Sequence, residues 1–309
     1  MPISTFVIAM RCSLCKSNAI YSDKRLCKKH FKSYFEKKVK KVMDSVIFRD
    51  KKLLVAISGG KDSTALLYSL TQIEKKVPFN IEAFYIDLGI KEYSEKSISK
   101  IQDLCTMCNV KLNLVKLSDY PKDIDNVAKS TENVCSICGT IKRYLMNKFA
   151  FENKFDYVLT GHNLDDELYF AINNLSSQHL GYFLRSGKIT KTESEKKLIG
   201  RAKPLYYLTE KESTIYCLIN KLPHYMDECP YSKESTQVVM KEKIFYLLDS
   251  KDKKLSFLKS VNKLKEGFLK NLDPNVKIKE KTQGTLTLCK SCGFPTSTEV
   301  CRFCRIMNG

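Results

Sequence analysis

The stretch Ser58-Gly59-Gly60-Lys61-Asp62-Ser63 decides how this chain is interpreted. The five residues before it, LLVAI at 53–57, form a short apolar run typical of a buried strand, and residues 63–73 carry apolar side chains at helical spacing. Two adjacent glycines let the backbone approach an anion, and the N–H groups that open the next helix present the positive end of its dipole. The stretch therefore predicts a phosphate-binding loop, with an ordinary glycine-rich turn as the alternative.

This loop is not a Walker A motif. That motif requires glycine at position 55 and serine or threonine at position 62, where this chain has Val55 and Asp62. SGGKDS instead resembles the PP-loop of ATP pyrophosphatases. The resemblance implies cleavage of ATP between its α- and β-phosphates and adenylation of a substrate.

Short apolar runs continue to alternate with helical stretches beyond the loop. We expect strands at 53–57, 81–89, 111–117 and 156–163, separated by helices at 63–73, 94–109 and 132–153. Strands that alternate with helices predict an α/β fold with a doubly wound parallel sheet, which binds its ligands beyond the carboxyl ends of the strands. After Asn173 we expect helices to dominate through about Lys270.

The pattern divides the chain into five predicted parts. They are an N-terminal zinc finger at 10–32, a basic linker helix at 33–50, a PP-loop ATP pyrophosphatase catalytic domain at 51–230, a helical extension at 231–281 and a C-terminal zinc ribbon at 282–309. Met10 stands two residues before the first ligand-type cysteine, so we hypothesise that the native chain begins there and excludes residues 1–9. The intact mass of the native protein would test this.

The charge of the chain indicates an anionic partner. The 53 Lys and Arg against 34 Asp and Glu give a net charge of +19 and a pI near 9.3. No apolar run approaches the ~20 residues of a membrane-spanning helix, and no lipidation motif is present. Nucleic acid is therefore favoured over a membrane surface, although a merely solvated basic face is the alternative for the lysine-rich stretch at 32–41.

The 13 cysteines are an odd number, so a closed disulfide framework cannot use all of them. Ten stand in five Cys-x-x-Cys pairs, which in a reducing compartment indicates metal binding. Two sets have the ligand number and spacing of structural zinc sites with no open position. The sets are Cys12, Cys15, Cys27 and His30 near the N-terminus, and Cys289, Cys292, Cys301 and Cys304 near the C-terminus.

The middle of the chain carries a different arrangement of thiols. Cys135, Cys138 and Lys142 share one face of the predicted helix, and Cys229 stands on a distant loop before Pro230. Two helical thiols and one on a loop suit an iron–sulfur cluster with one open iron, and the nearby cation is expected to lower the thiol pKa. A redox dithiol and buried structural thiols are the alternatives. The other three cysteines are expected in the core: Cys105, Cys108 and Cys217.

The sequence Gly-His-Asn-Leu-Asp-Asp-Glu at 161–167 follows the fourth predicted strand. This position places Gly161 and Asp166 near the nucleotide, where Asp166 could hold Mg²⁺ or orient a reacting group. The alternative is a helix N-terminus at which Asp165 and Asp166 complement the dipole.

Together, SGGKDS, Cys-Ser-Ile-Cys with Lys142, GHNLDDE, RAKPLYYLTEKE at 201–212, DECPYS at 227–232 and the two terminal zinc sets resemble the tRNA 2-thiouridine synthetases of the TtuA/NcsA type. The resemblance implies that ATP adenylates O2 of a tRNA uridine and that sulfide at the open iron of a 4Fe-4S cluster then displaces AMP from C2. It implies that the cluster is held by Cys135, Cys138 and Cys229, with Lys142 and Asp166 as further catalytic residues. The implied ATP-binding residues are Ala56, Ser58, Gly59, Gly60, Asp62, Ser63, Ile86, Lys142, Gly161 and Asp166.

The resemblance also implies partners and a location. These are tRNA, a sulfur donor that is either a ubiquitin-like thiocarboxylate carrier or free sulfide, a possible homodimer, and the cytoplasm, with no membrane. Family members modify the wobble uridine or the T-loop uridine, and T-loop thiolation accompanies growth at high temperature. The abundance of Asn, Ser and Lys favours the wobble position.

Three other interpretations stay open. A persulfide mechanism would use Cys138 and Cys229 without a cluster. A zinc-dependent tRNA-binding protein with a vestigial PP-loop would not be an enzyme. An amidating ligase of the NAD synthetase kind would explain the loop but neither the cysteines nor the charge.

Overall fold

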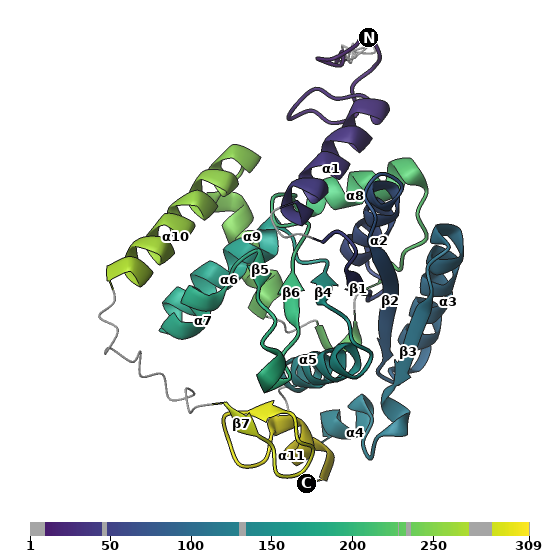
Figure 1. Cartoon of the computed structure of the whole chain (residues 1–309). Coiled ribbons are helices and arrows are strands. Elements are labelled where there is room, and N and C mark those ends of the chain that lie inside the picture. Colours follow the sequence, from purple (N-terminus) through teal and green to yellow (C-terminus); the bar gives the residue numbers. More distant parts are fainter. Residues whose placement is uncertain are drawn as a thin grey trace, which may run out of the picture.

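A computed structural model of the chain describes residues 10–44, 48–129, 134–227, 229–232, 236–271 and 286–308 (Figure 1). The hypothesis about residues 1–9 therefore lies outside the described part. In that part, no helix has the length and apolar character needed to cross a membrane.

The centre of the fold is a six-stranded sheet with the order β3-β2-β1-β4-β6-β5 (Figure 1). Neighbouring strands are parallel except for β5, which pairs antiparallel to β6 at the edge. The doubly wound parallel sheet predicted from the sequence is thus confirmed. The strands are β1 (Lys52–Ala56), β2 (Asn80–Asp87), β3 (Leu112–Lys116), β4 (Tyr157–Thr160), β5 (Ile189–Thr190) and β6 (Gly200–Ala202).

Helices dominate after Asn173 as expected, but the last two strands of the sheet, β5 and β6, also lie there and were not predicted. Both are too short for an alternating pattern to be visible in the sequence. Gly200 allows the pairing, because a Cβ there would lie 2.7 Å from the carbonyl oxygen of Thr190.

The two faces of the sheet are covered by different helices. Leu53 and Val55 pack with α2 (Lys61–Glu74) and α3 (Lys91–Cys108), whereas Leu54 packs on the other face with α5 (Val134–Glu152). This alternation follows from the two-residue period of strand β1. The remaining elements on the α5 side include α4 (Ile124–Lys129) and the short 3₁₀ helices η1 (Leu117–Asp119) and η3 (Pro230–Ser232).

The basic N-terminal helix α1 (Lys28–Met43) belongs to the main core. It buries one apolar face, and the ring of Phe35 stacks at 4.0 Å on Tyr216 of α8 (Glu210–Asn220). The helix begins at Lys28, inside the segment predicted as the zinc finger, and most of its lysines lie on the partly or fully exposed side.

The two helices of the segment predicted as a helical extension pack against α6 (Leu164–Ser176). Ile244 of α9 (Thr236–Leu247) and Leu258 of α10 (Lys251–Asn271) share a core with Leu164 and Leu168 of α6. Beside α6 lies α7 (Leu180–Arg185), which is followed by η2 (Ser194–Lys196). The extension is helical through Asn271, and residues 272–281 lie outside the described part.

The C-terminal module lies against α5 (Figure 1). It consists of the hairpin of β7 (Thr287–Leu288) and β8 (Pro295–Thr296) followed by α11 (Arg302–Asn308). Its cysteines are part of the same hydrophobic core as the α5 face of the sheet.

Candidate active site and metal centres

The predicted phosphate loop lies at the carboxyl end of β1, as a nucleotide-binding loop of an open parallel sheet should. Gly59 has a φ of +84°, a value that favours glycine, and Gly60 caps the amino end of α2. The Ser63 hydroxyl accepts a hydrogen bond from the Ser58 N–H at 3.1 Å and donates one to the Gly60 carbonyl at 2.9 Å. These contacts hold the loop in a tight turn whose backbone can approach an anion.

The predicted GHNLDDE turn meets this loop directly. A Cβ on Gly161 would lie 2.9 Å from the backbone nitrogen of Ser63, so only glycine allows the two loops to approach this closely. The Asn163 amide donates to the Asp62 carboxylate at 3.0 Å. Burial raises the pKa of Asp62, and the opposing charge of Lys61 does not reverse this effect. The structure therefore brings Gly161 and the PP-loop together.

Asp166 is almost buried at the third position of α6. Its carboxylate accepts a hydrogen bond from the Asn163 N–H at 3.0 Å, which completes a capping box, so the helix-start interpretation holds. The other carboxylate oxygen lies 2.5 Å from the Lys241 ammonium and 3.1 Å from the Gln237 amide. Burial would raise the pKa of Asp166, but the Lys241 charge lowers it overall, so the group is ionised.

His162 follows Gly161 and contacts the Thr160 hydroxyl at 2.8 Å through Nδ1. Burial lowers the pKa of His162 to about 4, because the charged imidazolium would lose its hydration. The ring is therefore neutral at physiological pH. Ala56 and Ile86 end neighbouring strands β1 and β2, as expected for side chains that line a nucleoside.

The three predicted cluster cysteines lie in one region. Cys135 is exposed and Cys138 half-buried on α5, and the Cys135 thiol donates to the Tyr231 carbonyl at 3.1 Å, directly after the Cys229-Pro230 turn. Cys138 and Cys229 belong to the same packed group, and the Cys229 and Cys135 thiols raise the pKa of Cys138. The Tyr231 hydroxyl donates to Asp125 at 2.6 Å and fixes this turn.

The expectation of a lowered thiol pKa is wrong for Cys138. Burial raises its pKa, and the nearby ammonium of Lys142 only partly compensates. The helical spacing predicts Lys142 as a neighbour, but burial of the Cys138 thiol depends on the packing of the whole core.

A backbone contact connects the cysteine turn with the PP-loop. The Tyr225 N–H donates to the Gly59 carbonyl at 2.8 Å, four residues before Cys229. The Tyr225 ring also packs edge-on against Tyr93, with centroids 5.3 Å apart. The segment that leads to Cys229 therefore packs against the nucleotide loop.

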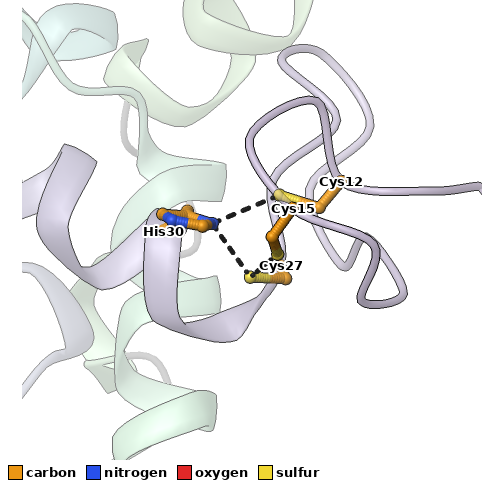
Figure 2. A group of neighbouring side chains, drawn as sticks. All are labelled: Cys12, Cys15, Cys27 and His30. Atoms are coloured by element: carbon orange, nitrogen blue, oxygen red, sulfur yellow. Dashed lines mark hydrogen bonds between the residues drawn. The ribbon is translucent and has the colours of Figure 1, made fainter.

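The N-terminal set can hold a metal ion. Figure 2 shows Cys12, Cys15, Cys27 and His30 pointing toward one another, and their ligand atoms all lie within 4.8 Å of each other. The His30 Nδ1 lies 3.4 Å from the Cys12 sulfur and 3.3 Å from the Cys27 sulfur. Backbone N–H groups outweigh burial and lower the pKa of Cys12 to about 6, which favours the thiolate that a metal requires.

The C-terminal set has the same property. The sulfurs of Cys289, Cys292, Cys301 and Cys304 lie within 4.8 Å of one another, and the Cys301 N–H donates to the Cys289 sulfur at 3.1 Å. Backbone N–H groups again outweigh burial and lower the pKa of Cys289 to about 6.

Cys105 and Cys217 are buried in the main core, and Cys108 packs against it. Burial raises their pKa values, to about 12 for Cys105 and Cys217 and about 11 for Cys108. The prediction that these three cysteines are structural is confirmed.

Comparison with known proteins agrees with this geometry. A family described as the PP-loop domain matches residues 31–248. The tRNA-5-methyluridine(54) 2-sulfurtransferase of Pyrococcus horikoshii is 37% identical over 303 residues, which cover 96% of this chain and 93% of that protein. The enzyme of the same name from Thermotoga maritima is 34% identical over 306 residues, 96% of each chain.

The chain belongs to the PP-loop tRNA-thiolating enzymes of the TtuA/NcsA type. A solved relative in this family is described as the U34-tRNA thiolase NcsA from Methanococcus maripaludis with its [4Fe-4S] cluster. It superposes with a TM-score of 0.80 at 28% identity, over 97% of this chain and 96% of that one. The interpretation of the chain as a non-catalytic tRNA-binding protein or an amidating ligase therefore falls away.

Two charged residues at the family's nucleotide site were missed by sequence reasoning. Glu210 accepts an ion pair from Lys61 of the PP-loop at 2.5 Å, and Lys241 approaches Asp166 from α9. Glu210 lies in the RAKPLYYLTEKE stretch, where Thr209 and Glu212 form a capping box. That pattern is visible in the sequence and predicts that Glu210 lies in the first turn of a helix. The position of Lys241 could not be predicted in this way, because the sequence of α9 shows no clear amphipathic period.

Proposed function

We propose that this protein uses ATP to convert a uridine of tRNA to 2-thiouridine. The observation that carries the proposal is the contact between the PP-loop and the Cys229 turn, through Tyr225 and Gly59. This contact brings the segment that leads to Cys229 against the loop proposed to bind ATP. The relatives are named as tRNA thiolation enzymes, which supports the same reaction.

ATP would be bound by the PP-loop and its neighbours. The N–H groups of Gly59, Gly60 and the first turn of α2 would bind the phosphates, with the Ser58 and Ser63 hydroxyls as further donors. Asp62 lies beside them, and Gly161 permits the close loop contact. Ala56 and Ile86 would line the nucleoside.

The reaction would proceed in two displacements. The uridine O2 would attack the α-phosphorus of ATP and release pyrophosphate, which makes O2 part of an AMP leaving group. A sulfide would then form a bond to C2 as AMP leaves, so no net electron transfer is needed. Lys142, which is exposed on the same face of α5 as Cys135 and Cys138, would stabilise the charge on the phosphates, and ionised Asp166 would orient Mg²⁺ or the uridine.

The residues present fit a 4Fe-4S cluster. Cys135 and Cys138 lie one turn apart on α5, and the Cys135 thiol contacts the Tyr231 carbonyl in the turn that carries Cys229. Three thiolates from these two elements would leave one iron of a 4Fe-4S cluster open. When bound, the cluster would supply an open iron site for sulfur.

The two terminal sets would hold structural Zn²⁺. Each offers four soft ligands converging on one point and leaves no position for water. Zinc is therefore proposed there for folding and not for catalysis.

The wobble uridine is the position favoured by composition. T-loop modification is the second candidate, because two relatives at 34% and 37% identity are named for position 54. Mass spectrometry of nucleosides from tRNA fragments of a deletion strain would locate the lost 2-thiouridine at the anticodon or in the T-loop. A cytoplasmic location, a homodimer, and either a thiocarboxylate carrier or free sulfide as donor are part of the proposal.

Anaerobic purification tests the core of the proposal. We expect about four irons and four labile sulfides per chain, and tRNA- and sulfide-dependent AMP release that is lost in Cys229→Ala. Cys217→Ala is the matched control, because that thiol is buried in the core and should not affect iron content. Full activity without iron would support the persulfide alternative, and no AMP release with any tRNA would contradict the function.

A further inference from the structure

We propose that Arg143 and Arg201, assisted by Arg302, form a binding site for a backbone phosphate of the tRNA substrate. The proposal rests on the proposed function, since it identifies where the anionic substrate of that function is held. It concerns a different position from the PP-loop, which would bind the phosphates of ATP.

Arg143 and Arg201 are neighbours, and no described residue forms an acidic partner for either. The Arg201 guanidinium donates to the Arg143 carbonyl at 3.4 Å. Every ion pair in the described part of the chain uses a lysine, so no carboxylate there lies within 4.0 Å of either guanidinium. Two arginines placed together without a counter-charge are unfavourable unless an anion binds between them.

The electrostatics of the pair support this interpretation. Burial and then the Arg143 charge lower the pKa of Arg201 to about 10. Burial also lowers the pKa of Arg143, and Arg302 adds to the effect. A guanidinium with a pKa of about 10 is still charged at neutral pH, so Arg201 would gain from an anion bound near it.

The site lies beside the cysteines of the proposed cluster. The Arg143 side chain reaches back over Gly139, whose added Cβ would lie 3.2 Å from Arg143 Nη1. Arg302, at the start of α11, donates to the Ser136 hydroxyl at 3.1 Å, between Cys135 and Cys138. A nucleotide fixed there would therefore stand close to the reacting centre.

The chemistry favours an RNA phosphate as the ligand. Guanidinium groups bind phosphate oxygens in a bidentate geometry. Tyr182 of α7, which is 52% exposed, interacts electrostatically with Arg143, and Arg185 lies 5.3 Å from its ring. An exposed aromatic ring beside arginines is the surface on which unpaired RNA bases stack.

The test measures tRNA binding by Arg143→Gln/Arg201→Gln with fluorescence anisotropy across a KCl series. We expect affinity to fall about tenfold and the slope of log Kd against log salt to decrease by about 1, because one phosphate contact is lost. Arg49→Gln/Lys76→Gln is the charge-matched control, because it also removes two charges, from exposed side chains that precede strands β1 and β2. Arg143→Lys/Arg201→Lys should keep the slope and lose part of the affinity.

Binding equal to that of the charge-matched control would overturn the proposal, and so would a loss of ATP affinity with unchanged tRNA affinity. If the double variant does not fold, single Arg143→Gln, compared with single Arg49→Gln, decides the question by the same slope. The wild-type enzyme is assayed for thiolation in parallel. If tRNA binding depends on Arg143 and Arg201 but the wild-type enzyme does not thiolate tRNA, only the proposed function is contradicted. If the wild-type enzyme thiolates tRNA but binding does not depend on the two arginines, only this site is contradicted.

Discussion

The ammonium of Lys241 lies 2.5 Å from the carboxylate of Asp166 and 3.6 Å from that of Glu210. Glu210 in turn pairs with Lys61 of the PP-loop. A chain of alternating charges therefore joins helix α9 to the nucleotide loop. The helical extension is part of the site and not only a covering of the sheet.

Substitution Lys241→Met should leave the Asp166 carboxylate buried without its main counter-charge. We expect the free energy of unfolding to fall by about 1–3 kcal/mol, less than for a fully buried pair because Lys241 is partly exposed. Urea denaturation at pH 7 measures this loss. Lys243→Met, on the exposed side of the same helix, should change the stability little.

The same pair predicts a dependence on pH. Lys241 lowers the pKa of Asp166 below its ordinary value of 3.8, so the stabilisation is present above that value and is lost as the pH falls through the lowered pKa. The difference in stability between wild type and Lys241→Met should therefore shrink below about pH 4. A constant difference from pH 3 to pH 7 would show that the ion pair is not its source.

Substitution Gly161→Ala should damage the nucleotide site. The new Cβ would lie 2.9 Å from the Ser63 nitrogen, so the PP-loop must shift. We expect ATP affinity, measured by calorimetry, to fall about tenfold or more, which corresponds to about 1.4 kcal/mol.

Gly267→Ala is the matched control for that substitution. Gly267 lies in helix α10 with nothing near the added methyl group, so the change should stabilise the helix by up to about 1 kcal/mol and leave ATP affinity unchanged. Equal ATP affinity in both variants would contradict the prediction, because it would mean that the PP-loop and the Gly161 turn can move apart without affecting ATP binding.

The parts of the fold that rest on local pattern were predictable from the sequence. Short spacings in the sequence, such as that from Cys12 to Cys15, predict the PP-loop, the parallel sheet and the two four-ligand sets. Residues so close in the chain stay close in the folded protein. The prediction failed where the pattern was too short to read, as in strands β5 and β6.

The rest of the site depends on long-range packing. Lys241 reaches Asp166 across 75 positions of the chain, and Arg201 reaches Arg143 across 58. Patterns of neighbouring residues in the sequence cannot predict contacts between residues so far apart in the chain. The raised pKa of Cys138 was missed for the same reason, because burial is a property of the assembled core and not of the helix that carries the thiol.

The C-terminal module should support the cysteines of α5. Phe303 stacks on Tyr144 at 3.8 Å, and Lys197 donates to the Gly293 carbonyl at 3.0 Å, so the module is fixed to the helix that carries Cys135 and Cys138. We expect Cys292→Ser to lower bound zinc by about one equivalent and also to reduce iron content by about half or more, since loss of a ligand typically unfolds such a module. Metal analysis of anaerobically purified protein measures both.

Cys15→Ser is the control, because its module packs near α8 and not against α5. It should lose zinc and keep iron. Equal iron content in the two variants would contradict the prediction that the C-terminal zinc site supports the cluster.

The buried pair of Glu212 and Lys251 should control stability without touching the active site. Lys251 donates to Glu212 at 2.5 Å and to the Tyr34 hydroxyl at 2.7 Å, and the Tyr21 hydroxyl donates to the same carboxylate at 2.9 Å. The contact therefore joins the N-terminal module, α1, α8 and α10. Glu212→Gln should cost about 3–5 kcal/mol in urea denaturation, because it leaves a buried ammonium unpaired. Glu92→Gln, in an exposed pair with Lys96, should cost less than about 1 kcal/mol.

The Glu212→Gln variant should also depend on pH. Burial already lowers the pKa of Lys251, and the lost carboxylate should lower it further. The folded variant then releases the Lys251 proton more readily than the unfolded chain does, so its deficit in stability should shrink as the pH rises from 7 toward 10. A deficit that is constant over this range would mean that the lost hydrogen bonds, and not the unpaired charge, destabilise the variant.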